Sequence, residues 1–406
     1  MSVAFEAALF WASVVLLLYT HFGYPALVWI WAWLRPRHPR ALGGEPEVSV
    51  VVVAQDEAPR IDARIENLLA QDYPVDCLTI LIASDGSTDG TAERARVYQQ
   101  RNVRVFAFSA RRGKPAVLND VVRAARGEVL VLADARQRFE TGALRALVAP
   151  FADPEVGVVS GELMLASGPD GSAVGEGVGA YWRYEKFIRR CESRIDSTLG
   201  ATGAIYAIRR ALFEPLPQDT LLDDVLIVLR IVRHGYRAIL EPKARAHDRP
   251  ATTAEEELRR KVRTLAGNFQ LFSHEPWLLN PLRNRLWIQT VSHKGLRLLC
   301  PLFLLGALSA NLCLVGSPMY AGALAGQIFF YAAALGGHAL QRRGKRTRLL
   351  AFPYVFCLLH WATVVAFFRF VTGQVAVTWK GTPSALRVPP VIDPAIDREC
   401  DAYAHE

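Results

Sequence analysis

The apolar residues of this chain are gathered into long runs toward its two ends, and a block of mixed composition lies between them. The first run covers residues 8–34, and further runs cover 300–315, 319–340 and 349–368. About 20 consecutive apolar residues suffice to cross the hydrocarbon core of a bilayer. A single water-soluble globule cannot bury several such runs, so the sequence predicts membrane segments on both sides of a soluble domain.

The first apolar run has two interpretations, an uncleaved anchor and a cleaved signal peptide. The extreme N-terminus contains no basic residue, and the run is longer than the apolar core of a signal peptide. We therefore expect residues 1–44 to form a transmembrane anchor followed by a basic linker.

The basic residues lie beside the apolar runs, and the formal net charge is +8. They follow the first run at Arg35, Arg37 and Arg40, and they precede the last run at residues 342–348. Under the positive-inside rule this predicts cytoplasmic flanks, and hence a cytoplasmic catalytic domain in a bacterial-type inner or plasma membrane. Nucleic acid is not an expected partner, because basic and aromatic residues are nowhere interleaved. Six scattered cysteines without CxxC spacing indicate reduced thiols.

The central block, residues 45–275, is expected to be an α/β domain with a doubly wound, mainly parallel sheet. Short apolar runs rich in valine alternate with segments compatible with helices. The predicted strands are 48–54, 78–84, 103–108, 129–133 and 156–159, and the predicted helices are 61–71, 91–100, 115–126 and 141–151. A glycine-rich loop over 165–180 and a helix over 181–194 should follow.

Residues 276–299 mix tryptophan and leucine with arginine and lysine, which is typical of an amphipathic helix in the membrane interface. A soluble connecting helix is the alternative. Membrane segments over 300–371 and a tail over 372–406 complete the chain. Three spans would place this tail outside the cell, whereas a re-entrant segment among them would place it inside.

Aspartates stand at three landmarks of the central block. Asp85 and Asp134 end apolar runs that are predicted strands, and the adjacent Asp223 and Asp224 precede the apolar run 225–229. Ligands of open α/β sheets bind at the carboxyl ends of strands. Transfer from a nucleotide-activated donor needs carboxylates to hold a cation at the diphosphate, and another carboxylate to deprotonate the acceptor. Asp89 and the glycines beside it are interpreted as a structural turn.

Basic residues offer partners for the phosphates. Lys114 opens a predicted helix, and Arg260 and Arg263 belong to a basic cluster that could instead contact anionic lipids. His247 is a further candidate metal ligand. Asp223 and Asp224 have a second interpretation as helix caps, although adjacent carboxylates repel unless a cation lies near.

Taken in order, these segments resemble the membrane-bound family 2 glycosyltransferases, which include cellulose, chitin, hyaluronan and poly-N-acetylglucosamine synthases. The resemblance covers about residues 45–275. It rests on Val-Ser-Val-Val-Val-Val-Ala, Ser-Asp-Gly-Ser-Thr-Asp-Gly, Gly-Lys-Pro-Ala-Val-Leu-Asn, Leu-Ala-Asp-Ala-Arg, Gly-Ala-Thr-Gly-Ala, Leu-Asp-Asp-Val and Arg-Lys-Val-Arg-Thr-Leu-Ala-Gly.

The resemblance implies a GT-A fold and inverting transfer from a nucleotide sugar, usually a UDP-sugar with Mg²⁺ or Mn²⁺. Asp85 would hold the nucleotide, and Asp134 would match the first aspartate of the family's DxD motif. Asp224 would be the base, with Asp223 in place of the family's glutamate. Thr202 and Gly203 would line the acceptor site.

Two departures qualify this resemblance. The DxD motif reads Asp134-Ala135-Arg136, and the family's QxxRW motif keeps Arg263 but lacks the tryptophan that helps hold a growing glycan. We therefore expect a membrane-bound glycosyltransferase acting on a glycan or lipid-linked acceptor in polysaccharide or glycolipid synthesis. The alternatives are transfer of one sugar to a lipid, and a catalytically silent nucleotide-sugar-binding partner of secretion-complex proteins.

Overall fold

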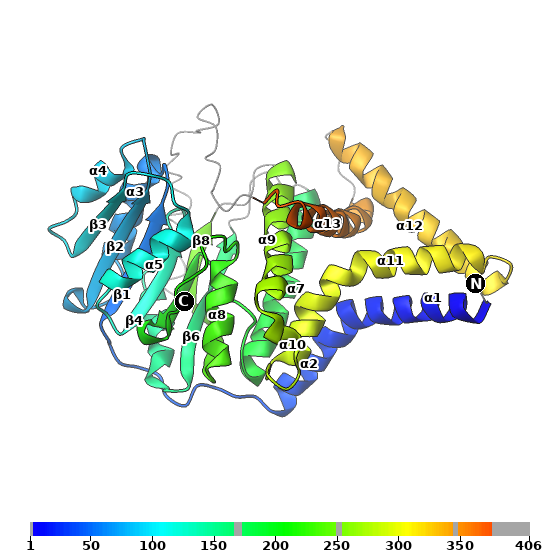
Figure 1. Ribbon diagram of the computed structural model, residues 1–406, viewed down its shortest axis with the longest axis horizontal. Helices are drawn as coiled ribbons and strands as arrows, with labels where there is room; N and C mark the ends of the chain where they lie inside the picture. Colours follow the sequence, from blue (N-terminus) through cyan, green and yellow to red (C-terminus); the bar gives the residue numbers. More distant parts are fainter. Residues whose placement is uncertain (1–2, 166–172, 249–253, 344–347, 376–406) are drawn as a thin grey trace. The chain divides into compact units, whose positions relative to one another are not determined.

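The computed structural model describes residues 3–165, 173–248, 254–343 and 348–375 (Figure 1). These residues form two compact units. The sheet unit contains residues 38–165 and 200–248, and the helical unit contains residues 3–37, 173–199, 254–343 and 348–375. The predicted domain boundaries stay a prediction, because this division follows spatial contacts and groups segments that are distant in sequence.

The sheet unit is built on one eight-stranded sheet in the order β3-β2-β1-β4-β7-β6-β8-β5. Neighbours from β3 to β4 are parallel, β7 runs antiparallel to both of its neighbours, and β6 is parallel to β8. The predicted mainly parallel sheet is therefore confirmed. The strands are β1 Val48–Ala54, β2 Leu78–Asp85, β3 Val103–Phe108, β4 Val129–Asp134, β5 Arg138–Phe139, β6 Val156–Leu165, β7 Ile205–Arg209 and β8 Arg237–Asp248.

Helices cover this sheet and bury its valine-rich strands. In α3 the apolar residues Ile61, Ile65 and Leu68 recur at helical spacing, and all three are fully buried in the core with Val50 and Ile80. The helices of this unit are α3 Ala58–Leu69, α4 Thr91–Arg96, α5 Lys114–Ala124, α6 Ala143–Val148 and α8 Asp223–Arg233.

The strand register brings two of the predicted site aspartates to one edge of the sheet. Val53 of β1 lies beside Asp134 of β4, and Ala54 of β1 lies beside Ser84, which precedes Asp85 in β2. Because these three strands are parallel, Asp85 and Asp134 stand at the carboxyl edge on either side of β1. This is the edge where open α/β sheets bind their ligands.

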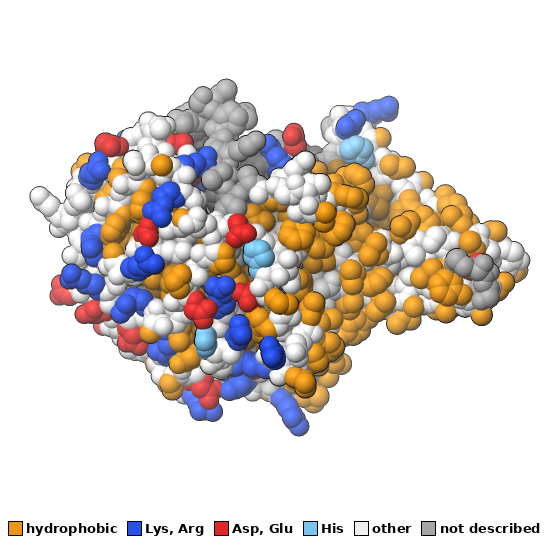
Figure 2. Space-filling view, viewed as in Figure 1, with side chains coloured by type: hydrophobic (Ala, Val, Ile, Leu, Met, Phe, Trp, Pro, Cys, Tyr) orange, Lys and Arg blue, Asp and Glu red, His pale blue; other side chains and the backbone are white. Residues whose placement is uncertain are grey.

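In the described part of the helical unit, four helices are long and apolar enough to cross a membrane. They are Val3–Leu34, Trp287–Cys313, Pro318–Arg342 and Leu349–Val371. Large apolar side chains such as Leu302, Phe329 and Trp361 are exposed on them, and Figure 2 shows hydrophobic side chains covering α11 and α12. The elements are α1 Val3–Leu18, η1 Tyr19–Gly23, α2 Tyr24–Leu34, α7 Ala173–Ile195, α9 Ala254–His274, η5 Pro276–Leu279, α10 Trp287–Gln289, η6 Thr290–Gly295, α11 Leu296–Cys313, α12 Pro318–Arg342 and α13 Arg348–Val371.

Two sequence predictions need correction in this unit. The glycine-rich segment is already helical from Ala173, while 166–172 lie outside the described residues. The single amphipathic helix over 276–299 is wrong, because η5 ends at Leu279 and the next helix begins only at Trp287. Asn284 interrupts it by donating to Leu278 O and accepting from Leu286 N. Most of the predicted tail, 376–406, also lies outside the described residues.

Candidate active site

Lys114 joins two of the predicted aspartates in the sheet unit. Its Nζ lies 3.0 Å from Asp134 Oδ1 and 3.1 Å from Asp223 Oδ2. Only 15% of the lysine side chain is exposed. Burial alone would lower the pKa of Lys114, but the charges of Asp134, Asp223 and Asp224 raise it above its ordinary value. The ammonium is therefore charged and holds the carboxylates together.

Asp85 fixes the turn from which Lys114 emerges. Its Oδ1 accepts a hydrogen bond from Arg112 N at 2.6 Å, and its Oδ2 accepts one from Gly113 N at 2.9 Å. Gly86 has a φ of +61°, and a Cβ there would lie 2.5 Å from Arg111 N. The loop before α5 therefore packs against the end of β2, and Asp85 has a positioning role. Its predicted contact with a nucleotide stays a prediction.

Asp224 lies against the segment predicted to line the acceptor site. Its Oδ2 accepts from Gly203 N at 3.1 Å, and its carbonyl O accepts from Ala201 N at 3.1 Å. Thr202 is buried, and its N–H donates to Ser160 Oγ at 3.0 Å. Three residues that the sequence assigned to the acceptor side, Asp224, Thr202 and Gly203, are thus brought together by the fold.

Tyr206 is a candidate that the sequence reasoning missed. It lies on β7 opposite Leu132 of β4, it is fully buried, and its hydroxyl has no hydrogen-bond partner among the described residues. Burial and the charges of Asp223, Asp224 and Asp134 raise the pKa of Tyr206 well above its ordinary value. Buried tyrosine hydroxyls are usually paired, so an unpaired one beside carboxylates indicates a polar group that awaits a ligand. The only sequence feature that could have pointed to Tyr206 is its position three residues after Gly203, which was assigned to the acceptor site.

Arg136 and His247 have partners other than the bridged carboxylates. Arg136 Nη2 lies 2.9 Å from Asp248 Oδ2, and the Asp248 side chain is only 2% exposed. His247 Nε2 lies 2.8 Å from Glu140 Oε1. The residue that replaces the second DxD aspartate therefore forms its own ion pair, and the predicted metal-binding role of His247 stays a prediction.

Arg260 and Arg263 lie on α9 and therefore belong to the helical unit. Arg260 is exposed, and Arg263 is half-buried. Their predicted contact with a diphosphate stays a prediction.

The charges around Lys114 suit a divalent cation. Three carboxylates, Asp134, Asp223 and Asp224, act on the Lys114 ammonium, so negative charge is concentrated around this one lysine. The three carboxylates offer oxygen ligands, which hard cations such as Mg²⁺ and Mn²⁺ prefer. These oxygens therefore fit the cation that the sequence resemblance implies, and the role of Asp134 as a metal ligand stays a prediction.

Comparison with known proteins finds a family match within the sheet unit. Residues 49–216 match the model of glycosyl transferase family 2. A beta-monoglucosyldiacylglycerol synthase of Nostoc sp. is 32% identical over 164 residues, covering 39% of this chain and 35% of that protein. An N-acetylglucosaminyltransferase of Rhizobium meliloti is 25% identical, covering 55% of this chain and 56% of that protein. This chain thus spans about a third to a half of these relatives.

The fold comparison reaches further along the chain. The structure of mannosyltransferase PcManGT from Pyrobaculum calidifontis, in complex with GDP-Man and Mn²⁺, superimposes with a TM-score of 0.69 and 23% identity. It covers 90% of this chain and 99% of that chain. The predicted GT-A fold and the predicted glycosyltransferase domain are confirmed. The narrower resemblance to cellulose and hyaluronan synthases stays a prediction.

Proposed function

We propose that this chain, whose residues 49–216 are a glycosyl transferase family 2 domain, transfers a sugar from a nucleotide sugar to a lipid hydroxyl at a membrane, with inversion at the anomeric carbon. One observation carries the proposal. Lys114 bridges Asp134 and Asp223, and the neighbouring Asp224 is hydrogen-bonded to the segment 201–203. These contacts support a cationic site for a diphosphate beside a carboxylate base.

The acceptor side depends on Asp224. Its carboxylate would accept the proton of the acceptor hydroxyl, and the resulting oxygen would attack the anomeric carbon. The bond from that carbon to the diphosphate breaks, and the new bond forms on the opposite face of the sugar. The hydrogen bond from Gly203 N holds the carboxylate in a fixed orientation, which general-base catalysis requires.

The donor side depends on Lys114 and Asp134. The Lys114 ammonium would stabilise the diphosphate as negative charge develops on it, because it lies in a site where water is largely excluded. A Mg²⁺ or Mn²⁺ ion held by Asp134 would neutralise the leaving group when bound. Arg263, and with it Arg260, remain candidates for the same diphosphate. A UDP-linked sugar is the donor we propose to test first.

Three observations favour a lipid acceptor over a growing glycan. The described residues include four helices apolar enough to cross a membrane, and the similar Nostoc protein is named for a glucosylated diacylglycerol. The chain also lacks the tryptophan that processive synthases place after the conserved arginine, since Thr264 follows Arg263. A glycan acceptor is the second candidate. We also propose a cytoplasmic active site, which the basic flanks of the apolar helices support.

The decisive experiment uses full-length protein purified in detergent. It would be incubated with UDP- and GDP-sugars and diacylglycerol in mixed micelles, while nucleoside diphosphate release and product mass are followed. We expect a glycolipid that gains a single sugar. Products of many sugars would overturn the lipid acceptor, and a lack of transfer with every donor would favour a silent binding partner.

The base assignment is tested by Asp224→Asn in the same assay. We expect transfer to fall by at least about 100-fold, the lower end of what general-base catalysis contributes, while donor binding is retained. Asp219→Asn is the matched control, because Asp219 is exposed and precedes α8 by a few residues. Full activity in Asp224→Asn would show that another group takes the proton.

A further inference from the structure

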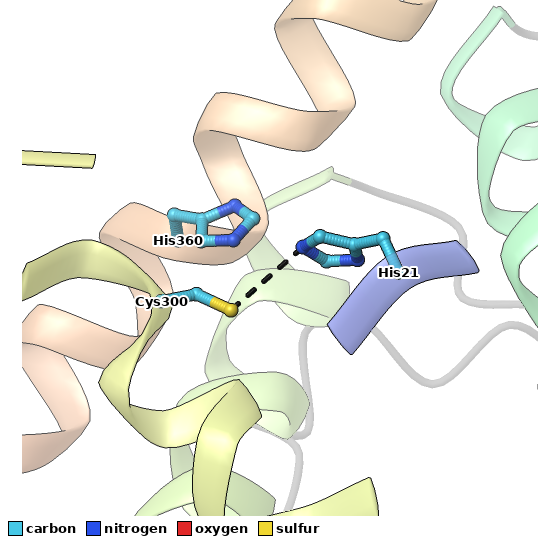
Figure 3. A group of neighbouring side chains, drawn as sticks. All are labelled: His21, Cys300 and His360. Atoms are coloured by element: carbon cyan, nitrogen blue, oxygen red, sulfur yellow. Dashed lines mark hydrogen bonds between the residues drawn. The ribbon is translucent and has the colours of Figure 1, made fainter. Parts of the chain in front are cut away.

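Three side chains that can bind a transition metal meet inside the helical unit. His21 comes from η1, Cys300 from α11 and His360 from α13 (Figure 3). His21 Nε2 lies 3.7 Å from Cys300 Sγ, and the ligand atoms of all three residues lie within 4.8 Å of one another. Within the described residues, this is the one group of three histidine, cysteine or acidic side chains whose ligand atoms converge so closely.

The two histidines are held by their surroundings. His360 Nδ1 lies 2.7 Å from the carbonyl O of Phe356, so a proton on Nδ1 leaves the lone pair on Nε2. Such a hydrogen bond on the second nitrogen is the usual support of a metal-binding histidine. His21 lies in a five-residue π-helix, and its carbonyl O accepts from Tyr184 Oη at 2.9 Å. Single π-helical turns are frequent at functional sites, because they redirect a side chain.

The spacing of the ligands agrees with metal coordination. Zinc–sulfur and zinc–nitrogen bonds of about 2.3 and 2.1 Å at a tetrahedral angle place the two ligand atoms about 3.6 Å apart. The observed separation of His21 Nε2 and Cys300 Sγ is 3.7 Å. Cys300 is fully buried, as expected for a thiolate ligand shielded from water.

We propose that His21, Cys300 and His360 bind a thiophilic d-block ion, Zn²⁺ or Cu⁺. Thiolate and imidazole select these ions over Mg²⁺ and Ca²⁺. On binding, the Cys300 thiol releases its proton to solvent, and the sulfur forms the bond to the metal. The ligands come from the helices Val3–Leu34, Trp287–Cys313 and Leu349–Val371, so the ion cross-links three of the four apolar helices. The site is separate from the sugar-transfer carboxylates and does not depend on the proposed function.

The first test is metal analysis of the full-length protein purified without an affinity metal. We expect about one equivalent of zinc or copper per chain, because three protein ligands define a single site. The metal that is found shows whether the site holds Zn²⁺ or Cu⁺. Strong chelators should remove it and lower the thermal unfolding temperature, and Co²⁺ added to the metal-free protein should give a thiolate-to-cobalt charge-transfer band.

Variants locate the site. Cys300→Ser and His360→Gln should each lose the metal and the cobalt band. Cys313→Ala, on the same helix as Cys300, and His338→Ala, on α12, should retain both. If the ligand variants fail to fold, the cobalt spectrum of the wild-type protein and the effect of chelators on it still test whether a metal is bound through a thiolate. Wild-type protein without zinc, copper or a thiolate–cobalt band would overturn the proposal, as would a Cys300→Ser variant that keeps the metal.

Discussion

The backbone N–H of Gly203 donates to Asp224 Oδ2 over 3.1 Å, so the proposed base is held by the segment proposed to line the acceptor site. A Cβ at position 203 would lie 3.0 Å from that same oxygen. Glycine at this position therefore lets the backbone approach the carboxylate closely. The orientation of Asp224 depends on this approach, and the first prediction follows from it.

Gly203→Ala should displace the Asp224 carboxylate without altering the donor side. We expect kcat to fall by about tenfold or more, which corresponds to about 1.4 kcal/mol of transition-state stabilisation, while the KM for the nucleotide sugar stays within about twofold. Steady-state kinetics measure both. Gly142→Ala is the matched control, because a Cβ at Gly142 meets nothing within 4 Å. Equal activity of the two variants would contradict the role of Gly203.

Lys114→Met should destabilise the protein, because it leaves three carboxylates without their shared cation. The expected loss is about 3 kcal/mol of unfolding free energy, the scale for breaking a buried pair. Thermal or denaturant unfolding in detergent measures it. The double variant with Asp223→Asn should recover part of the loss, because one repelling charge is removed. Loss of donor binding should accompany both variants, and a Lys114→Met variant as stable as wild type would argue against the bridge.

Arg136→Asp restores the aspartate spacing of the family's DxD motif, yet we expect it to destabilise the protein. The new carboxylate would face Asp248, whose side chain is 2% exposed and lies 2.9 Å from Arg136. Removing one partner of such a pair costs about 3–5 kcal/mol. The melting temperature measures the loss of stability, and adding Asp248→Asn should recover much of the lost stability. An Arg136→Asp variant with wild-type stability would show that the ion pair is dispensable.

The sequence allowed the carboxyl edge of the sheet to be predicted well. Strands β1, β2 and β4 are short apolar runs that are buried on both faces, so they stand out from the helices between them, and their register puts Asp85 and Asp134 at one edge. Strand β8 was missed because its twelve residues include five charged side chains and a histidine, so it does not read as an apolar run. Asp248 at its end is the partner of Arg136, so that ion pair could not be anticipated either.

The candidate site was predictable by residue type but not by contact. The sequence pattern identified Asp134, Asp223 and Lys114 separately. The ion pairs that join them depend on how α5 and α8 pack against the sheet. Asp85 was expected to face a ligand, and yet both of its oxygens accept backbone hydrogens. Local sequence does not reveal such a contact, because a carboxylate at a strand end can either bind a ligand or accept hydrogen bonds from the backbone.

Asp89 should contribute to the acid sensitivity of the sheet unit. Burial would raise its pKa, but hydrogen bonds from Thr91 and Ala58 N lower it below the ordinary value of 3.8. A lowered folded-state pKa means that this stability is present above pH 3.8 and is lost as pH falls through the folded value. Asp89→Ala should cost about 3 kcal/mol at neutral pH, because Asp89 accepts hydrogen bonds from Ala58 N, Thr91 N and Thr91 Oγ1, each worth about 1 kcal/mol. Unfolding free energies of the variant and the wild type, measured from neutral to acidic pH, should converge in acid. A difference that stays constant with pH would contradict the proposed contribution of Asp89.

Tyr206→Phe separates a packing role from a ligand-binding role. The Tyr206 hydroxyl is buried without a partner among the described residues, so its removal should leave the melting temperature unchanged or slightly raised. The raised pKa keeps the hydroxyl protonated, so it can donate a hydrogen bond beside Asp134 and Asp223 when donor and cation bind. We therefore expect the affinity for the nucleotide sugar to fall about 5- to 10-fold, as loss of one hydrogen bond of about 1 kcal/mol implies. Calorimetric titration of the donor measures this. Unchanged affinity at unchanged stability would mean that the hydroxyl only fills space in the core.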